Sequence, residues 1–541
     1  MEKIIVIFFI IIVAIFLRFY HLNKRGVLFW DDGVRLNYVL FIDDLVNFLI
    51  KNFKKILNKE KKLEEEVKNF RGQHLCTANT LDVFIYWIVG KLIKNFEFSP
   101  LFVNALFGVL GIIGIFFTSN LMGGEKIGIL SVFLLSISGY HLMYSRAFHG
   151  DIGCGTFYIW ATFFYLLSTG KNIEVNLIYL AISGFLISFA FLYNSRQFYI
   201  PIFFIFYEFI LFILQPSIFF ISRILILSLT MMLPLVITQE IFVILKEIGY
   251  PYPTYFNQLL RFGGHFSKFD FKFPGLKMYI ETFYNLEGII IPIFFIVGNF
   301  FLIKNLSCFW KDKIIIPVIL FTQFWIPFLL WASRGYKIGF DRNILEGKFH
   351  PWNNSCPRHI STSIYSMVIV TSIGLTVLPN NFFYILLFFI LIINLYNNLN
   401  NIISVKSGYK DAINFIKNKT GDGKHISFCY PISAFYVGNN NVIDINILNN
   451  KDDFFKFYQE GQFRYLLYIK MIHLNSFKNI ELLNEILNIL KPSYKIFHGF
   501  AKFKPFIYDE LNTLSFIMPH ENFIEIYDLS QYYELQKQFK K

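Results

Sequence analysis

Long apolar runs separated by polar connections occupy the first 400 residues of the chain. A helix needs about 20 apolar residues to cross the hydrocarbon layer of a bilayer, which is about 30 Å thick. About eleven runs approach this length and are predicted as transmembrane helices: 4–20, 99–121, 127–143, 153–169, 176–193, 198–214, 221–245, 288–303, 314–332, 359–378 and 382–399. The pattern predicts an α-helical polytopic membrane domain over residues 1–400.

The connections between these helices indicate an orientation. With the amino terminus in the cytoplasm, the very short connections lie inside, which agrees weakly with the positive-inside rule. They carry Lys126, Lys171, Lys304, Lys311 and Lys313. An odd number of crossings then places the first loop, residues 21–98, and the C-terminal region outside the cytoplasm. We expect a multi-pass plasma-membrane protein in contact with membrane lipids.

The first outer loop contains two stretches that are predicted to lie in the membrane interface. Residues 43–70 place apolar side chains near helical spacing opposite a Lys-rich face, which is typical of an interfacial amphipathic helix. Residues 81–93, LDVFIYWIVGKLI, are apolar but too short to cross a bilayer. Tyr86 and Trp87 in this second stretch suit the head-group level.

The pattern changes after residue 400 to that of a soluble domain. Helix-like segments (DAINFIKN, DDFFKFYQ, IELLNEILNIL) alternate with strand-like ones (HISFCY, NVIDINI, RYLLYIK, YKIFHGF). This alternation predicts a small extracytoplasmic α/β domain over residues 401–541 with a mainly parallel sheet. It contains neither GxGxxG nor a P-loop, so the sequence gives no support for nucleotide binding.

Composition agrees with a membrane protein. The chain is 55% hydrophobic and only 16% charged, with a formal net charge of +13. In a soluble protein such a charge would suggest nucleic acid, but here we assign it to lipid head groups and phosphates and expect no nucleic-acid partner. The five Cys residues form no CxxC or Cys/His cluster, so no zinc site is predicted.

Polar residues at the outer ends of the helices are the candidates for chemistry. The first is the pair Asp31-Asp32, in FWDDG beyond the first span. Adjacent carboxylates can act as a general base or can bind a hard divalent cation. A solvated turn is the alternative, since Asp-Gly is common in turns.

Three further polar groups lie on the same predicted side. Arg146 and Asp151 occur in YSRAFHGD, Arg196 in NSRQ and Arg358 in CPRH. Arginine at these places can bind a phosphate through its two-pronged guanidinium group. Arg146 and Asp151 can instead pair with each other, and an Arg at a helix end often only extends to the interface.

In their order, these features resemble the membrane-embedded GT-C glycosyltransferases, in particular the branch of protein O-mannosyltransferases and the lipid A aminoarabinose transferase. The similar segments are FLRFYHL with FWDDGVRLNYV, LDVFIYWIVGKLI with KNFEFSPLFVNALFGVLG, MYSRAFHGD, CPRHISTSIYSMVIVTSIG and the YKDAINFIKNKT…HISFCYP tail, over essentially residues 1–440. Asp32 stands where the family usually has Glu, and Asn79-Thr80 replaces the usual Pro-Pro.

The resemblance implies a function and roles for these residues. The enzyme would move a sugar from a polyprenyl-phosphate donor to an acceptor hydroxyl of a protein, lipid or glycan on the outer face of the membrane. Asp31 would be the catalytic base, and Asp32 would position the acceptor. The donor phosphate would be bound by Arg146, Arg196 and Arg358, with Asp151 in support. A divalent cation, if one takes part, would be held by Asp31 and Asp32.

Two other functions fit parts of the pattern. A transporter or lipid flippase would also be polytopic, but the chain lacks repeated halves and Gly- or Pro-broken paired helices. An oligosaccharyltransferase or polysaccharide polymerase would share the fold. Relatives of the oligosaccharyltransferases carry a WWD-type motif in the C-terminal domain, and this sequence has none.

Overall fold

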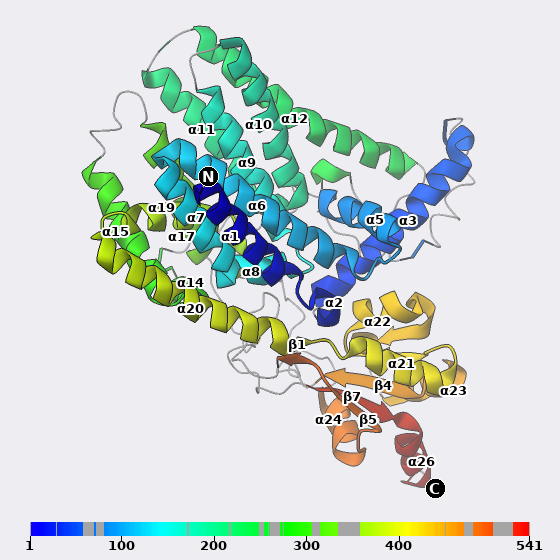
Figure 1. The fold of residues 1–541 in the computed structure, drawn as a ribbon. Coiled ribbons are helices and arrows are strands. Elements are labelled where there is room, and N and C mark those ends of the chain that lie inside the picture. Colours follow the sequence, from blue (N-terminus) through cyan, green and yellow to red (C-terminus); the bar gives the residue numbers. More distant parts are fainter. Residues whose placement is uncertain are drawn as a thin grey trace.

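The computed structural model describes residues 2–28, 30–57, 70–71, 80–169, 173–214, 216, 218–247, 254–257, 259, 271–273, 275–305, 314–333, 357–448, 451–461, 463–469, 480–500 and 523–539. Helices dominate the first 400 residues (Figure 1). They are α1 Glu2–Phe19, α2 Leu22–Arg25, α3 Trp30–Leu57, α5 Leu81–Ile93, α6 Ser99–Gly123, α7 Glu125–Ile137, α8 Gly139–Ser145, α9 Asp151–Ser168, α10 Ile173–Tyr193, α11 Tyr199–Leu214, α12 Ile218–Glu247, α14 Leu276–Glu287, α15 Ile290–Lys304, α17 Ile315–Ala332, α19 Ser363–Leu375 and α20 Asn380–Ser404, with 3-10 turns η3 Ser195–Gln197 and η6 Pro357–Ile360.

Each of the eleven predicted spans falls on helical structure. Among the described residues, seven helices are long and apolar enough to cross a membrane, or eight if the bent pair α7–α8 is one span. The other predicted spans coincide with α9, with α15 (15 residues) and with η6 and α19 (13 residues). The expected fold class, an α-helical polytopic membrane protein with a small C-terminal α/β region, is confirmed.

The α7–α8 span is broken by a bend of 60°. A break frees backbone groups that must find partners inside the protein. On the α7 side, the buried Arg18 donates to two carbonyl oxygens of the last turn at 3.2 and 3.3 Å. On the α8 side, Oε1 of Glu287 accepts from the Ser138 hydroxyl at 2.6 Å and from the Tyr140 N–H at 2.9 Å. Two ionisable side chains therefore hold the bend from opposite sides.

The first predicted loop is more helical than its sequence suggested. The helix α3 begins at Trp30, so Asp31 and Asp32 lie in its first turn and the alternative of a solvated Asp-Gly turn is wrong. The amphipathic stretch 43–70 belongs to this helix as far as Leu57, and most of its remainder lies outside the described residues. The short helix predicted over 81–93 is α5, with the same bounds.

The C-terminal region contains a five-stranded sheet in the order β3-β2-β4-β7-β5. Its strands are β2 His425–Ser427, β3 Val442–Asp444, β4 Tyr465–Ile469, β5 Tyr494–Phe497 and β7 Phe523–Asp528; β1 Val405–Lys406 pairs with β6 Gly499–Phe500. The pairs β2–β3 and β2–β4 are parallel, but β7 runs antiparallel to both its neighbours. The four strands predicted from sequence, β2, β3, β4 and β5, therefore run in one direction, as expected for a mainly parallel sheet, and the strand that was not predicted, β7, is the antiparallel one.

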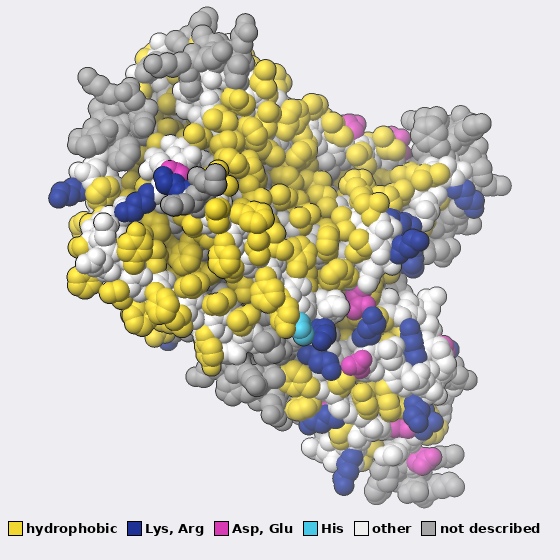
Figure 2. All heavy atoms as spheres, viewed as in Figure 1, with side chains coloured by type: hydrophobic (Ala, Val, Ile, Leu, Met, Phe, Trp, Pro, Cys, Tyr) yellow, Lys and Arg dark blue, Asp and Glu magenta, His cyan; other side chains and the backbone are white. Residues whose placement is uncertain are grey.

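Helices pack around this sheet, and two of them face the membrane part. The helices are α21 Tyr409–Thr420, α22 Tyr430–Val437, α23 Lys451–Gly461, α24 Ile480–Ile489 and α26 Leu529–Phe539. In Figure 1, α21 and α22 lie between the sheet and the helical bundle. Figure 2 shows apolar side chains over the bundle, whereas charged side chains gather over the C-terminal region. This division fits a bundle in lipid and a domain in water.

Candidate active site

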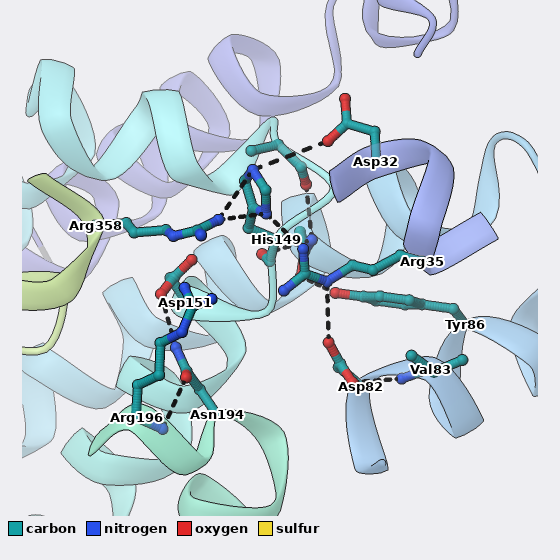
Figure 3. Close-up of polar contacts among 12 residues, drawn as sticks. Asp32, Arg35, Asp82, Val83, Tyr86, His149, Asp151, Asn194, Arg196 and Arg358 are labelled. Atoms are coloured by element: carbon teal, nitrogen blue, oxygen red, sulfur yellow. Dashed lines mark hydrogen bonds and ion pairs between the residues drawn. The ribbon is translucent and has the colours of Figure 1, made fainter. Parts of the chain in front are cut away.

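Side chains from five segments meet where the bundle approaches the C-terminal region (Figure 3). The segments are the starts of α3 and α5, the turn between α8 and α9, the turn η3 and the turn η6. They include Asp32, Asp151, Arg196 and Arg358 among the residues predicted from sequence.

Asp32 is completely buried at the start of α3. Its Oδ2 accepts from the backbone N–H of Leu28 at 3.0 Å. The carboxylate thus also fixes the backbone that leads into the first turn of α3. Its Oδ1 lies 3.9 Å from Nε2 of His149. Asp31 is in the same helical turn, but its side chain lies outside the described residues.

His149 connects two arginines at the centre of the site. Its Nδ1 accepts from Nη1 of Arg35 at 2.6 Å, and Nη1 of Arg358 lies 3.0 Å from Nδ1 and 3.4 Å from Nε2 of the same ring. Burial, and then the charges of Arg358, Arg35 and other arginines, hold the pKa of His149 well below its ordinary value. The imidazole is therefore neutral, and because Nδ1 accepts, its proton is assigned to Nε2, on the side of Asp32.

A second carboxylate lies on the other side of Arg35. Oδ2 of Asp82, at the start of α5, accepts from Nε of Arg35 at 3.4 Å, and both side chains are buried. Burial raises the pKa of Asp82 to about 6, although the charge of Arg35 opposes this. A Cβ at Gly150 would lie 3.0 Å from Oδ2 of Asp82, so glycine at this position lets the turn after His149 approach the carboxylate.

The remaining predicted residues of the site follow on the α9 side. Asp151 is buried, and its Oδ1 accepts from Nδ2 of Asn194 at 2.7 Å. Oδ1 of Asn194 accepts in turn from the backbone N–H of Arg196 at 3.2 Å. The positive charge of Arg196 also contributes to the low pKa of His149. Asp151 thus fixes the turn that presents Arg196.

Arg146 has a different environment. Its Nη1 donates to the carbonyl oxygens of Leu17, Arg18 and Tyr20 at 2.9–3.1 Å, at the end of α1. The cation therefore binds the negative end of that helix, an arrangement that stabilises helix termini. Asp151 instead binds the side chain of Asn194. Burial lowers the pKa of Arg146 to about 9, so the group stays charged at neutral pH.

Among the described residues, no group of three or more His, Cys, Asp or Glu is placed to hold a metal ion. The site instead combines three guanidinium groups (Arg35, Arg196 and Arg358) with three carboxylates and one neutral imidazole. Arginines gathered in a buried site suit an anion such as a phosphate, and a carboxylate beside them can accept a proton. The prediction of a cation held by Asp31 and Asp32 stays a prediction.

Three residues of the site were not singled out from sequence: Arg35, Asp82 and His149. Arg35 follows Asp32 by three positions, so helical spacing would have placed both on one side of α3. Asp82 is the one acidic residue of the apolar stretch 81–93, and His149 lies inside the segment that had been chosen for Arg146 and Asp151.

Known proteins resemble this chain in part of its sequence and in its fold. Residues 81–241 match the family described as dolichyl-phosphate-mannose-protein mannosyltransferase. No curated protein matches the chain.

Solved structures resemble the whole chain at low sequence identity. ArnT from Cupriavidus metallidurans, bound to undecaprenyl phosphate, has a TM-score of 0.57 at 11% identity, covering 96% of this chain and 97% of ArnT. The oligosaccharyltransferase of Archaeoglobus fulgidus has a TM-score of 0.53 at 11% identity, covering 87% of this chain and 70% of that one. The same enzyme, AglB, in complex with an inhibitory peptide and a dolichol-phosphate, has a TM-score of 0.52 at 12% identity with the same coverage. The chain therefore has the fold of ArnT and AglB, and its residues 81–241 match the mannosyltransferase family.

Proposed function

We propose that this protein is a glycosyltransferase that moves a sugar from a polyprenyl-phosphate donor to the hydroxyl group of a protein, lipid or glycan. The observation that carries the proposal is the pair of buried guanidinium groups joined at His149, with the carboxylate of Asp32 on the other side of that ring. The solved relatives ArnT and AglB, which hold polyprenyl phosphates, agree with a lipid-linked donor.

The proposed reaction is a direct displacement. Arg35 and Arg358 hold the phosphate, with Arg196 beside them, and stabilise the charge that develops on it as it leaves. A carboxylate at the start of α3, Asp31 in our proposal, takes the proton of the acceptor hydroxyl while that oxygen attacks the anomeric carbon. The bond from this carbon to the phosphate oxygen breaks, and the polyprenyl phosphate departs with the bonding electron pair. Attack from the side opposite the phosphate inverts the anomeric configuration.

Asp32 and Asp82 have supporting roles in this scheme. Asp32 faces the proton that we assign to Nε2 of His149 and so keeps Nδ1 available to the two arginines. Asp82 compensates part of the charge of Arg35 when no donor is bound.

One experiment tests the function and the base together. The purified protein is offered a panel of radiolabelled polyprenyl-phosphate sugars, and transfer by the wild type is compared with that of Asp31→Asn and Asp32→Asn. We expect transfer from one donor and a fall in kcat of about 100-fold or more for Asp31→Asn. Transfer by Asp31→Asn at the wild-type rate would exclude Asp31 as the base. Uptake or flipping of the lipid into vesicles without sugar transfer would favour a transporter.

The likeness to an archaeal oligosaccharyltransferase gives a second candidate. Such an enzyme would consume a lipid-linked oligosaccharide and ignore the lipid-linked monosaccharide. Offering both donors at equal concentration decides between the two functions, because only the competent donor loses its sugar.

A further inference from the structure

We propose that the C-terminal domain holds the catalytic end of α3 in place, and that Asn37 is the positioning residue at this contact. The proposal rests on the transferase function proposed above. It adds that the domain which follows the last membrane helix is a structural part of the active site.

The chain segment just before α3 is bound to the start of the C-terminal domain. The N–H of Ser407 donates to the carbonyl oxygen of Arg25 at 2.9 Å, and its hydroxyl donates to the carbonyl oxygen of Val27 at 2.5 Å. Gly26 between them has a φ of +66°, and a Cβ there would lie 2.7 Å from Cβ of Ser407. These contacts end one residue before Leu28, whose N–H binds Asp32.

The first turns of α3 are bound to the start of α22. Nδ2 of Asn37 donates to the carbonyl oxygen of Gly33 at 2.8 Å, within the helix, and to that of Pro431 at 2.6 Å, across the contact. A Cβ at Gly33 would lie 2.6 Å from the backbone N of Ile432, which is too close for any side chain. The two backbones therefore meet directly at the helical turn that follows Asp32.

Apolar packing extends this contact to the rest of the site. Leu36 and Phe148 are completely buried in one cluster with Ile432, Tyr409 and other side chains of the C-terminal domain. Leu36 is the neighbour of Arg35, and Phe148 is the neighbour of His149. The C-terminal domain thus packs next to the segments that carry Asp32, Arg35 and His149.

Catalytic geometry of this kind is sensitive to small shifts, since a misplacement of about 1 Å can cost about 100-fold in rate. Loss of the Asn37 contact should therefore change the rate of the chemical step more than it changes donor binding. Of the three arginines proposed to bind the phosphate, only Arg35 lies on α3, whereas Arg358 and Arg196 lie on segments that this contact does not touch.

The test compares two single substitutions in the full-length protein. Asn37→Ala removes the bond to α22. Asn398→Ala removes a similar buried bond at the end of α7, from Nδ2 of Asn398 to the carbonyl oxygen of Ile137 at 2.8 Å, which involves no residue of the candidate site. For Asn37→Ala we expect kcat to fall about tenfold or more with the donor KM within about twofold of the wild type. Asn398→Ala should keep kcat within about twofold of the wild type, even if its Tm falls as much as that of Asn37→Ala.

Amide hydrogen exchange gives a measurement that does not depend on activity. We expect exchange in residues 25–37 and 146–150 to be faster in Asn37→Ala than in the wild type and Asn398→Ala. Unchanged exchange, or an equal loss of kcat in both variants, would overturn the inference. If the wild type transfers no sugar from any donor but the exchange differs, the proposed function has failed and the positioning contact stands.

Discussion

At the scale of single residues, the candidate site depends on the imidazole of His149, which contacts the guanidinium groups of both Arg35 and Arg358. Two guanidinium groups repel each other, so bringing both to Nδ1 of His149 needs a neutral ring and nearby anions. Asp82 lies beside Arg35, and Asp32 lies on the far side of the ring. A bound phosphate would add negative charge beside these arginines, in agreement with the proposed function.

The two arginines predicted from helix ends, Arg358 and Arg146, should respond differently to the same substitution. Arg358→Gln removes a charge from the arginines that we propose to bind the phosphate, and we expect the donor KM to rise by about tenfold or more. Arg146→Gln removes the cation that binds the end of α1, and we expect a lower Tm with the donor KM nearly unchanged. Steady-state kinetics and thermal unfolding of both variants check this. A raised KM in Arg146→Gln with an unchanged Tm would return Arg146 to the phosphate site.

Asp82 should make donor binding depend on pH. Its pKa is about 6 in the free protein, and a bound anion would raise this pKa further. Affinity for the donor, a phosphodiester whose single charge does not titrate in this range, should be highest below pH 6. The affinity should fall as the pH rises through about 6 and should then level off. The total fall should be about tenfold for each unit by which the pKa of Asp82 is higher in the donor-bound protein than in the free protein.

Asp82→Asn should bind the donor with the same affinity from pH 5 to pH 8, close to the wild-type value at low pH. Titration calorimetry over this range measures the difference. A wild-type affinity that does not vary with pH would contradict the assignment.

Only part of the site could be predicted from the sequence, for a physical reason. Asp32, Arg196 and Arg358 stand out because polar residues at the ends of membrane helices are costly and few. His149 and Asp82 also lie near helix ends, but the sequence does not show which residues they contact. Their importance comes from contacts between segments far apart in the chain, such as Arg358 and His149 at a separation of 209 residues.

At the scale of elements, the bend between α7 and α8 depends on Glu287. Burial raises the pKa of this carboxyl to about 7 from an ordinary value of 4.5. The folded state therefore favours the protonated form. Protonation of Glu287 therefore adds to the free energy of unfolding. This contribution is fully present below about pH 4.5 and is lost as the pH rises through about 7, with a total on the order of 3 kcal/mol.

Glu287→Gln keeps an oxygen acceptor for Ser138 and Tyr140 but does not titrate. We expect its Tm to decline less than that of the wild type between pH 5 and pH 8, as followed by scanning fluorimetry. Glu287→Leu serves as the control, since it should lower the Tm at every pH by removing the acceptor. Equal slopes in the wild type and Glu287→Gln would show that Glu287 does not titrate in this range.

Elements were easier to predict than their junctions. Every apolar run predicted as a span lies on helical structure, and seven or eight of the described helices are long and apolar enough to cross a membrane, because the bilayer demands length and apolarity. The start of α3 was missed because its first turn is polar in sequence, and its buried environment comes from the C-terminal region, almost 400 residues later in the chain. The strand β7 was missed because its partners, β4 and β5, are separated from it in sequence.

At the scale of the whole molecule, the two ends of the bundle should face different compartments. Lys3 pairs with Glu125 at 2.7 Å, so the amino terminus and the α6–α7 turn lie at the same end. The candidate site and the C-terminal domain lie toward the other end (Figure 1). We propose that the first end is cytoplasmic and that the site opens to the outside.

Labelling in intact cells checks this orientation. Asp422→Cys and Glu125→Cys each introduce a thiol at an exposed position, on the C-terminal domain and the α6–α7 turn respectively. We expect a membrane-impermeant maleimide to label Asp422→Cys above the wild-type background, and Glu125→Cys only after the cells are opened. The reverse pattern would place the site in the cytoplasm.

The bond from Asn37 to the carbonyl oxygen of Pro431 joins residues separated by 394 positions. A ribosome that adds 5–20 residues per second needs roughly 20–80 s to make that stretch. During this time the start of α3 has been made but the domain that contacts it has not. A nascent chain therefore contains Asp31 and Asp32 but lacks a complete site until the C-terminal domain has been made. A chain truncated before this domain would be inserted in the membrane but inactive.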